Sequence, residues 1–559
     1  MKFKHRDDKQ IIRYIPLGGV GDVTRNMHVY EYSGDILVVD CGIGFPDETM
    51  PGVDYLVPDV SYLEDKIDRI RGIIITHGHE DHFGALPIIL QKLPVPVYAT
   101  KLVRGLIEVK LEANDMLKKA TLHTLDPNQP LRLGNFELEF FRVAHSVPDS
   151  VGILIKTPIG NLIHAADYKF DWTPVDGRPT EVNKLARYGE AGVLCLMSDC
   201  LRVEKPGYTL PEKFIEESFE REMRKAPGRI FITTFSSNIS RIQQAVNASR
   251  KFNRRVTFAS KTMETYFLMA EKLGYAHLSK KQFVPIKKAA AVPDKNLTIV
   301  GSGSQGEPEA ALTRIAHGDH KYLEVKEGDT IIFASDQIPG NEEAIRRNID
   351  LLTSLGANVL YTDIMADIHV SGHASREELK LMLGLTRPRF VVPISGTPIM
   401  AKLYQDLAVE MGWKKDAVFV LQNGQALELG KDFARLGKKI SCRNIMVDGL
   451  GVGDIGRIVL RDRKVLSEQG MLLAVVPIDA TTGKISGKIE IVSRGFVFEK
   501  SAQDILGRCQ KIVEKVIAKH EGRMKDLTFI REVVEEELEQ YIYDKLGRTP
   551  MIIPVLIEV

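Results

Sequence analysis

The sequence predicts an α/β protein with a sheet-on-sheet core flanked by helices, an inserted doubly wound α/β domain and a small C-terminal α/β domain. Up to about residue 205, short β-branched runs alternate with glycine turns and helical stretches, which is typical of two packed sheets. From Leu210 onward, helices and buried strands alternate regularly, as in a doubly wound sheet. Apolar residues at helical spacing from Ile505 to Ile517, and a strand-like run from Met551 to Ile557, predict the third part.

The elements after residue 208 follow from the length and composition of the apolar runs. We expect helices over residues 212–225 and 241–251, and buried strands over 229–233, 297–300 and 330–333. Two further strands, 357–361 and 390–394, should return to the first core. Because 559 residues are too many for one core, the prediction is four segments: 1–208 for the first core, 209–355 for the insert, 356–445 for the returning part and linker, and 446–559 for the C-terminal domain.

Composition and charge limit the class of protein. The 75 basic and 74 acidic residues nearly cancel, so no overall field draws the chain to nucleic acid or membrane. The basic run from Lys431 to Arg443 is interpreted as a solvated face, with a local RNA-binding patch as the alternative. No stretch approaches the roughly 18 consecutive apolar residues that span a bilayer, and residues 1–6 lead into charge rather than an apolar signal core. Five cysteines without CxxC spacing predict thiols of a reducing compartment, so we expect a cytoplasmic protein without a membrane partner.

The most informative motif, Thr76-His77-Gly78-His79-Glu80-Asp81-His82, directly follows an apolar run. A strand that ends at Thr76 places the next side chains in a loop at its carboxyl end. There, His77 and His79 can face one metal while Asp81 and His82 face a second. Imidazole and carboxylate suit Zn²⁺ or Mn²⁺, and two metals in one pocket suit hydrolysis at phosphorus or at a carbonyl. A histidine-rich surface loop is the less favoured alternative, because ligand type, spacing and the preceding strand agree.

Further ligands are expected where later strands end. His145 follows the run Phe140–Ala144 and would complete a three-histidine site, and Asp167 could bridge both metals through its two oxygens. Taken alone, each is more often a cap or a turn residue, but their order after the histidine motif favours the metal site. Asp40 precedes Cys41-Gly42 and is expected to orient a ligating imidazole. A turn aspartate before glycine is the alternative for Asp40.

Together these residues resemble the metallo-β-lactamase superfamily, and longer motifs are similar to the ribonuclease J family of its β-CASP group. The motifs cover essentially the whole chain and are Pro16–Gly21, Phe45–Glu48, Pro58–Leu63, His145–Ser150, Asp167–Asp171, Pro206–Thr209, Gly303–Pro308, Ile338–Glu342, His369–Ser375 and Arg548–Pro554. The resemblance implies a metallo-β-lactamase αββα sandwich with an inserted β-CASP domain. It also implies a metal-dependent ribonuclease whose partner is RNA.

The resemblance implies roles for residues outside the histidine motif. Asp81, Asp199 and His373 correspond to catalytic residues. An imidazole beside a carboxylate stays protonated and oriented, so His373 can give its proton to the leaving 3′ oxygen. The residues that match RNA contacts are Ser236, Ser237, Asn238, His369, Ser371, Gly372 and His373. A capping box over Ser375–Glu378 should start a helix after His373, so that the backbone of residues 371–372 lies where amide groups favour a phosphate; a cap-and-turn cluster without a substrate role is the alternative.

Two positions depart from the family pattern. Ser395 stands where the family has the histidine that completes the second metal site, which leaves Asp81, His82 and Asp167 there. Ser240 stands where the family has a histidine near the substrate. The expected cofactor is therefore Zn²⁺ in two sites, the second one weaker, with Mn²⁺ or Mg²⁺ as alternatives.

Three functions follow as hypotheses. The preferred one is an active metal-dependent ribonuclease in RNA processing and decay, acting as a 5′-3′ exonuclease, an endonuclease or both, and assembling as a homodimer or homotetramer. The second is a non-catalytic or weakly active RNA-binding subunit that pairs with an active paralogue. The third is a hydrolase of DNA or of a small ester. The β-CASP-like insert argues against a small substrate, because it would cover the metals and leave a channel suited to a strand.

Overall fold

A computed structural model describes residues 10–335, 337, 340–365, 367–479, 482, 484–496, 499–520 and 527–559. Residues 1–9, and Ile338 and Pro339 of the Ile338–Glu342 motif, lie outside the described residues. The chain divides into two compact units, Met1–Phe45 with Leu56–Ile445, and Pro46–Tyr55 with Met446–Val559.

The first unit contains two large sheets that face each other. The eight-stranded sheet has the order β20-β19-β1-β2-β3-β5-β6-β7. Its strands are β1 (Ile12–Gly18), β2 (Met27–Tyr32), β3 (Asp35–Val39), β5 (Ile70–Ile75), β6 (Val97–Ala99), β7 (Leu122–Thr124), β19 (Gln425–Gly430) and β20 (Phe433–Lys439). The six-stranded sheet has the order β18-β12-β11-β10-β9-β8. Its strands are β8 (Leu131–Leu133), β9 (Phe136–Arg142), β10 (Val151–Thr157), β11 (Gly160–His164), β12 (Cys195–Asp199) and β18 (Phe390–Ile394).

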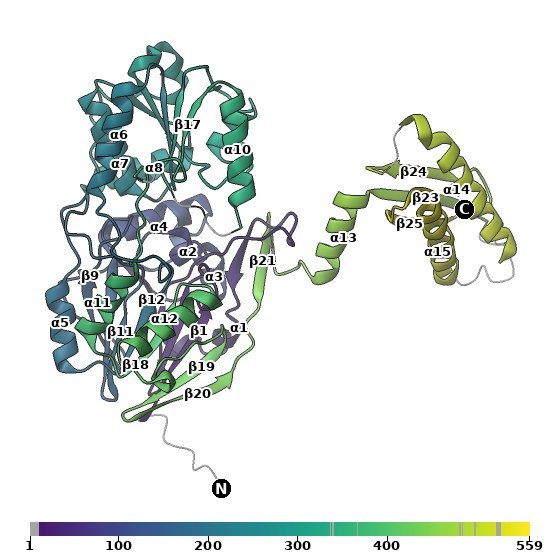
Figure 1. The fold of residues 1–559 in the computed structure, drawn as a ribbon. Helices are drawn as coiled ribbons and strands as arrows, with labels where there is room; N and C mark the ends of the chain where they lie inside the picture. Colours follow the sequence, from purple (N-terminus) through teal and green to yellow (C-terminus); the bar gives the residue numbers. More distant parts are fainter. Residues whose placement is uncertain are drawn as a thin grey trace, which may run out of the picture. The chain divides into compact units, whose positions relative to one another are not determined.

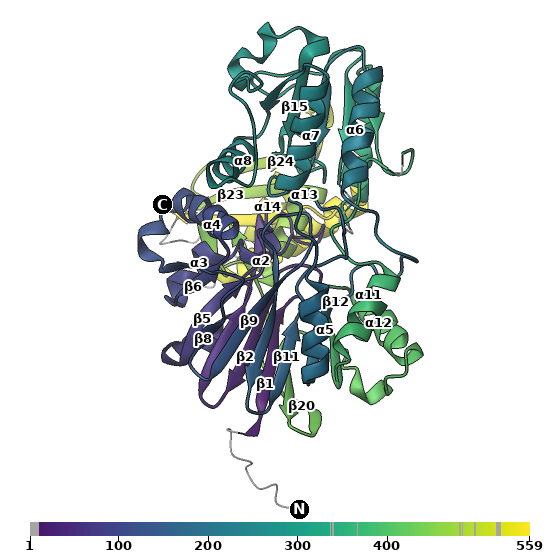
Figure 2. The same cartoon turned by 90° about the vertical axis from the view of Figure 1, so that its left-hand side faces the viewer.

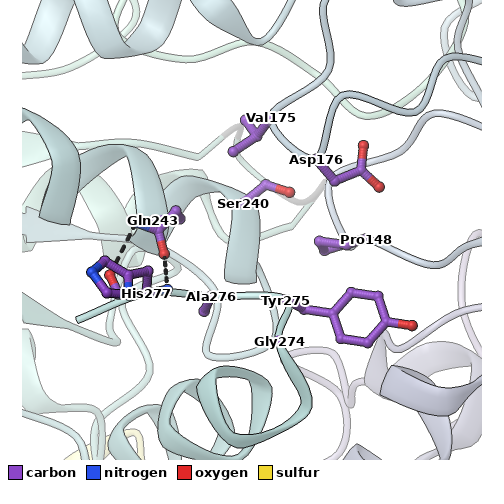
Figure 3. Close-up of a pocket in the computed structure, with 9 residues that line it drawn as sticks. All are labelled: Pro148, Val175, Asp176, Ser240, Gln243, Gly274, Tyr275, Ala276 and His277. Atoms are coloured by element: carbon purple, nitrogen blue, oxygen red, sulfur yellow. Dashed lines mark hydrogen bonds between the residues drawn. The ribbon is translucent and has the colours of Figure 1, made fainter. Parts of the chain in front are cut away.

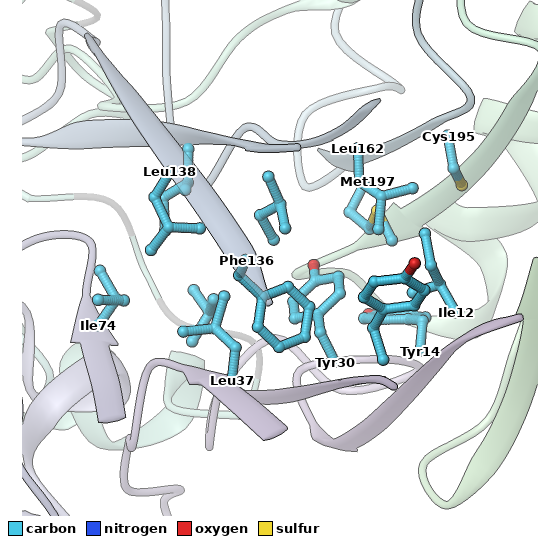
Figure 4. Packing of buried hydrophobic residues seen from close by; sticks show 14 of the residues in the cluster. Ile12, Tyr14, Tyr30, Leu37, Ile74, Phe136, Leu138, Leu162, Cys195 and Met197 are labelled. Atoms are coloured by element: carbon cyan, nitrogen blue, oxygen red, sulfur yellow. The ribbon is translucent and has the colours of Figure 1, made fainter. Parts of the chain in front are cut away.

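Apolar side chains fill the space between these sheets. Tyr30 and Leu37 of the eight-stranded sheet pack with Phe136 and Leu162 of the six-stranded sheet, and all four are fully buried (Figure 4). Strands that are buried on one or both faces are rich in β-branched and aromatic residues because such residues pack well on a pleated surface. The core between the sheets therefore fixes where each strand ends, and with it the loops that carry the histidine motif.

Helices cover the outer faces of both sheets. The six-stranded sheet is covered by α5 (Val182–Ala191), α11 (Arg376–Thr386) and α12 (Pro398–Glu410), whose buried residues pack with Phe141, Leu154 and Ile163 (Figure 2). Helix α4 (Lys101–Ala113) lies on the other side, beside β6 and β7, and α3 (Leu86–Lys92) packs against α4. Short elements of this unit are α1 (Ser61–Glu64), α2 (Glu80–Phe83), Ile67–Arg69, Leu117–Lys119 and Lys415–Ala417. This arrangement confirms the expected αββα sandwich.

The insert is a second α/β layer structure within the first unit (Figure 1). Its parallel sheet has the order β14-β15-β13-β16-β17. The strands are β13 (Ile230–Thr233), β14 (Arg255–Phe258), β15 (Leu297–Gly301), β16 (Thr330–Phe333) and β17 (Asn358–Leu360). The helices are α6 (Lys213–Lys225), α7 (Ile239–Lys251), α8 (Lys261–Leu273), α9 (Ala311–Ala316) and α10 (Glu342–Ser354), with short 3₁₀ turns at Ile286–Ala291 and Asp294–Asn296. The doubly wound prediction is confirmed.

Two strands were predicted to return to the first core, and the prediction is wrong for one of them and right for the other. The run 357–361 was expected to return to the first core, but β17 pairs in parallel with β16, with Val359 opposite Ile331. Only residues 355–357 separate α10 from β17, so the strand can reach only the sheet that α10 covers. The run 390–394 does return, because β18 pairs in parallel with β12, with Val392 opposite Met197.

The second unit has a small core of its own. Strands β23 (Met471–Ile478), β24 (Glu490–Arg494) and β25 (Met551–Glu558) form a sheet in the order β24-β23-β25. Helices are α13 (Arg457–Gln469), α14 (Glu499–Lys519) and α15 (Leu527–Leu546), and a further strand is β22 (Gly451–Val452). The boundary between the two units falls within β4 (Tyr55–Pro58) and within β21 (Asn444–Asp448). Val513 and Ile517 of α14 are buried against the sheet, so its apolar stripe is core, as expected. Among the described residues, no helix has both the length and the apolarity that a membrane crossing needs.

Candidate metal centre and substrate site

Three histidines meet in loops that follow the carboxyl ends of β5 and β9, one strand from each of the two facing sheets. β5 ends at Ile75, and the loop after it carries His77 and His79. His77 Nε2 lies 3.1 Å from His79 Nδ1, and His79 Nδ1 lies 3.0 Å from His145 Nε2. Nitrogens bound to one Zn²⁺ at tetrahedral angles are about 3.3 Å apart, given Zn–N bonds of about 2.0–2.1 Å. The three imidazoles therefore present a nitrogen set that fits one divalent metal.

Asp167 supplies a fourth donor to the same group. Its carboxylate and the three imidazole nitrogens all lie within 4.8 Å of one another. Asp167 is 3% exposed, and within the described part of the chain its Oδ1 has no hydrogen-bond partner. A buried, unpaired carboxylate oxygen is costly unless a cation or a donor meets it. The residues present therefore fit a bound metal ion on the chemistry of the donors as well as on their spacing.

The protonation of the three histidines suits metal binding. Burial lowers the pKa of His77 and of His79 well below the usual value for histidine. Burial also lowers the pKa of His145, to about 3. Neutral imidazole is the form that binds a metal, so at neutral pH these side chains have no proton to displace.

Asp81 and His82 lie beside this group and face Asp167. His82 Nε2 is 3.2 Å from Asp167 Oδ2 and 3.7 Å from Asp81 Oδ2. Burial raises the pKa of Asp81 to about 6. Burial alone would lower the pKa of His82, but Asp167 and then Asp40 outweigh it and raise that pKa. A metal at this position must therefore displace a proton from His82, which makes binding here more pH-dependent than at the three histidines.

Asp40 makes the contact expected of it. Its Oδ2 accepts a hydrogen bond from His82 Nδ1 at 2.8 Å, and its Oδ1 accepts one from the backbone N–H of Thr76 at 2.8 Å. The Thr76 hydroxyl lies 2.9 Å from Asp40 Oδ2 and 3.0 Å from His77 Nδ1. Asp40 also has a φ of 64°, a left-handed conformation that non-glycine residues adopt at some energetic cost. This one carboxylate thus orients His82 directly and His77 through Thr76.

The side chain of Ser395 bonds to Asn26, and it is Asn26 that lies beside His82. The Ser395 hydroxyl donates to Asn26 Oδ1 at 3.3 Å, and its backbone N–H donates to Gly19 O at 2.7 Å. Asn26 Nδ2 in turn lies 3.1 Å from His82 Nε2 and 3.2 Å from Asp81 O. Sequence reasoning missed Asn26, which stands in a turn before β2 without any metal-site spacing. In this structure the Asn26 amide lies between Ser395 and the imidazole.

His373 and Asp199 form a close pair next to the metal group. His373 Nδ1 donates to Asp199 Oδ2 at 2.6 Å, and donor atoms of both residues lie within 4.8 Å of one on Asp167. Burial alone would lower the pKa of His373, but Asp199 and Asp167 outweigh it and raise that pKa to about 9. The imidazole is therefore charged at neutral pH and can donate a proton.

Four of the other residues expected to contact RNA, namely Asn238, His369, Ser371 and Gly372, have contacts within the protein. Asn238 caps α7 by accepting from the backbone N–H of Arg241 at 2.9 Å. The Ser371 hydroxyl accepts from the His373 N–H at 3.3 Å, and Gly372 O accepts from His145 Nδ1 at 2.8 Å. Ser237 is buried, Ser236 is half-buried, and His369 lies beside Arg241. The predicted capping box at Ser375 is present. Cap and turn contacts are thus visible at Asn238 and Ser371, and Gly372 orients His145.

A buried ion network joins the insert to the core and was missed by sequence reasoning. Arg241 of α7 is fully buried and donates to Glu212 Oε2 and to Val370 O, each at 3.1 Å. Glu212 also accepts from Lys169 Nζ at 2.9 Å. Arg241 contacts His369 Nδ1 at 3.1 Å as well. The network therefore ties α7 to both segments that connect the insert with the core.

The αββα sandwich and the cluster of candidate metal ligands define the class of protein: it has the metallo-β-lactamase fold and a candidate metal site where that fold's strands end. Family models match as follows: metallo-β-lactamase superfamily over residues 20–230, ribonuclease J β-CASP domain over 227–352, Zn-dependent metallo-hydrolase RNA specificity domain over 363–418, and ribonuclease J C-terminal domain over 458–559. The chain belongs to the ribonuclease J family, because it is 37% identical to ribonuclease J2 of Bacillus subtilis over 560 residues, which covers 100% of both chains.

Other relatives agree with this assignment. Ribonuclease J 1 of Streptococcus pyogenes serotype M3 is 37% identical over 542 residues, covering 97% of this chain and 96% of the relative. A solved structure of a protein of unknown function from Enterococcus faecalis has a TM-score of 0.52 at 16% identity and covers 75% of this chain and 100% of its own. At that identity the likeness shows the fold alone.

Proposed function

We propose that this chain is a metal-dependent ribonuclease that cleaves phosphodiester bonds of RNA in processing and decay. The observation that carries the proposal is one cluster, in which His77, His79, His145 and Asp167 converge beside the Asp199–His373 pair. Zn²⁺ suits the donor set best, and Mn²⁺ or Mg²⁺ are the alternatives. Membership of the ribonuclease J family supports RNA as the substrate.

The chain's own residues account for binding, orientation and proton transfer. His77, His79, His145 and Asp167 would hold a divalent metal, which would supply Lewis-acid polarisation of the phosphate and an activated water. Asp199 keeps His373 protonated and fixes its ring, since the two atoms are 2.6 Å apart. His373 then gives its proton to the departing 3′ oxygen, which leaves a 5′-phosphorylated product.

Substrate contacts and assembly complete the proposal. Ser236, Ser237, Asn238, His369, Ser371 and Gly372 would hold the RNA strand, and Asp81 and His82 would hold a second, weaker metal. We expect a homodimer or homotetramer, with an active paralogue as a further partner. Since all five cysteines are free thiols, a reducing compartment, the cytoplasm, suits the protein.

A second candidate function rests on Ser395. Its hydroxyl bonds to Asn26 rather than to a ligand position, so the second site has only Asp81, His82 and Asp167 from the protein. Three ligands give a weaker site than four. A non-catalytic or weakly active RNA-binding subunit therefore follows if two metals are required for cleavage.

Incubation of the metal-loaded protein with end-labelled RNA tests both candidates. The RNA carries a label at either end and a 5′ monophosphate or a 5′ triphosphate, and His79→Ala serves as the metal-site control. Mononucleotides from the monophosphate form support a 5′-3′ exonuclease, and internal fragments from both forms support an endonuclease. RNA that is bound but left intact, with a full complement of metal, would instead identify the non-catalytic subunit.

A further inference from the structure

Helix α8 of the insert packs on α4 of the core (Figures 1 and 2). The two helices approach closely at Gly105 of α4, where a Cβ atom would lie 2.4 Å from Met269 Sδ. On the core side, a Cβ atom at Gly78 of the histidine motif would lie 2.4 Å from Leu106 Cδ1. Consecutive residues of α4 therefore contact the insert and the histidine motif.

A tyrosine of α8 bonds to the histidine motif itself. Tyr266 is 2% exposed, and its hydroxyl donates to Glu80 Oε1 at 3.0 Å. The other carboxylate oxygen, Glu80 Oε2, accepts from Lys110 Nζ of α4 at 2.8 Å. In the chain, Glu80 lies between His79 and Asp81. The insert and α4 thus hold one carboxylate whose two neighbours are candidate ligands of the two metals.

The position of this segment depends on such contacts. Helix α2 is a single turn, Glu80–Phe83, and one turn of helix is not stable by itself. On one side, the Ile43 N–H donates to Glu80 O at 3.0 Å and the Cys41 N–H donates to His82 O at 2.7 Å. These bonds fix the backbone of the turn from the core. The carboxylate of Glu80 adds the contact to the insert, so the orientation of the turn is set from both sides.

A second tyrosine, two residues after α8, bonds to the loop of the third histidine. The Tyr275 hydroxyl donates to Asp149 Oδ2 at 2.8 Å, and Asp149 lies four residues after His145. Figure 3 shows Tyr275 beside Pro148 on the wall of a cavity of about 200 Å³ between insert and core, which Ser240 also lines. The α8 segment therefore bonds to a carboxylate in each of the two loops that carry the three histidines.

We propose that α8 is a positioning element for the metal centre, in which Tyr266 orients the histidine motif through Glu80 and Tyr275 orients the His145 loop through Asp149. The proposal rests on the proposed function, since it takes the metal site from it. It adds that metal affinity depends on the docking of the insert. Because coupling between two equilibria is reciprocal, a bound metal must in turn strengthen that docking.

Metal binding to the full chain tests this role. Competition with a chromophoric chelator gives the affinity for the first Zn²⁺, and the visible absorption of the Co²⁺-loaded chain reports ligand geometry. Tyr266→Phe removes only a hydroxyl and should weaken Zn²⁺ binding about tenfold, the lower end for a residue that orients a ligand, with a changed Co²⁺ spectrum. Lys101→Met is the matched control, because Lys101 Nζ also joins α4 to α8, by a bond to Leu273 O at 3.2 Å outside both loops. Both measurements should stay at the parent level in this variant.

A double-mutant cycle with Glu80→Ala shows whether Tyr266 acts through that carboxylate. The Glu80 side chain is 28% exposed, so alanine leaves no closed cavity. In the Glu80→Ala background, Tyr266→Phe should cause no further loss of Zn²⁺ affinity. An equal further loss there, an unchanged affinity and spectrum in Tyr266→Phe, or a loss of the same size in Lys101→Met overturns the proposal.

Two parallel measurements complete the test. Zn²⁺ should slow hydrogen exchange of the α8 amides more in the parent than in Tyr266→Phe, and equal slowing would contradict the coupling. RNA cleavage by the parent separates this proposal from the proposed function. Weakened Zn²⁺ binding in Tyr266→Phe without cleavage by the parent refutes the nuclease and leaves the positioning role standing. Cleavage by the parent with unchanged Zn²⁺ binding in Tyr266→Phe does the reverse, and a parent that binds no metal overturns both.

Discussion

Replacing Arg241 by methionine should destabilise the first unit and weaken the packing of the insert on the αββα core. Arg241 is fully buried and donates to the carboxylate of Glu212 and to the carbonyls of Ala334 and Val370. Methionine keeps most of the volume but removes the charge and all the donors. The carboxylate and the two carbonyls then lose a partner that water cannot replace in the interior.

The magnitude follows from the burial of both partners. Glu212 is 2% exposed and keeps its bond to Lys169 at 2.9 Å, so its charge is not left wholly unpaired. Removal of one partner from a buried pair costs about 3–5 kcal/mol, and we expect a loss in that range. The segment proposed to hold RNA should be affected as well, because Val370 lies directly between His369 and Ser371. Cleavage at limiting RNA should therefore fall more than metal content does.

Denaturant unfolding of the parent, Arg241→Met and the control Arg250→Met measures the effect. Arg250 is an exposed residue on the same helix, so its replacement should change the free energy of unfolding by less than about 0.5 kcal/mol. A double-mutant cycle with Glu212→Gln isolates the coupling between the two charges. A loss below about 1 kcal/mol for Arg241→Met, or fully additive single effects, would refute the reasoning.

Four further outcomes test other parts of the site. His79→Ala should abolish cleavage and lower bound metal while unfolding stays cooperative; cleavage at the parent rate would remove His79 from the metal site. His373→Ala should slow cleavage by about 10²- to 10⁴-fold at unchanged metal content, and a loss of metal would make it a ligand instead. Burial alone would raise the pKa of Glu212, but Lys169 and Arg241 outweigh it and lower that pKa to about 2. Its contribution to stability is thus present above the unfolded value of about 4.3 and lost as pH falls toward 2, so Glu212→Gln should flatten the acid limb of stability in that window; equal slopes would contradict this. Ser395→His should raise occupancy of the second metal at limiting metal and increase cleavage, and a metal titration that gives two metals in both proteins would count against it.

Local patterns predicted most of the fold. The runs 229–233, 330–333 and 390–394 appear as β13, β16 and β18, because each is a short apolar segment bounded by turns or helices. The histidine motif could be placed at a strand end because it follows such a run, and the structure brings His77, His79, His145 and Asp167 together there. The metal and catalytic roles of these residues stay predictions, as do the segment boundaries at 208, 355 and 445.

Contacts between distant parts of the chain could not be predicted in the same way. Asn26 and Ser395 are 369 positions apart, and no spacing rule connects them. The composition of Asn358–Leu360 shows a strand but not which sheet it joins, and the three-residue connection after α10 decides that only once the helix is placed. Arg241 looked like the start of a helix, whereas its function in the fold is set by Glu212 and Val370.

The two serines that depart from the family pattern have separable consequences. Ser395 lies behind Asn26 and bears on His82 and the second metal, whereas Ser240 lines the cavity between core and insert. Among the described residues, no hydrogen bond joins the side chain of either serine to the three-histidine group or to the Asp199–His373 pair. If RNA binds as proposed, a chain that has lost cleavage through Ser395 would still bind RNA. Metal stoichiometry and RNA binding are independent measurements for that reason, and together with the cleavage rate they distinguish a nuclease from a binding subunit.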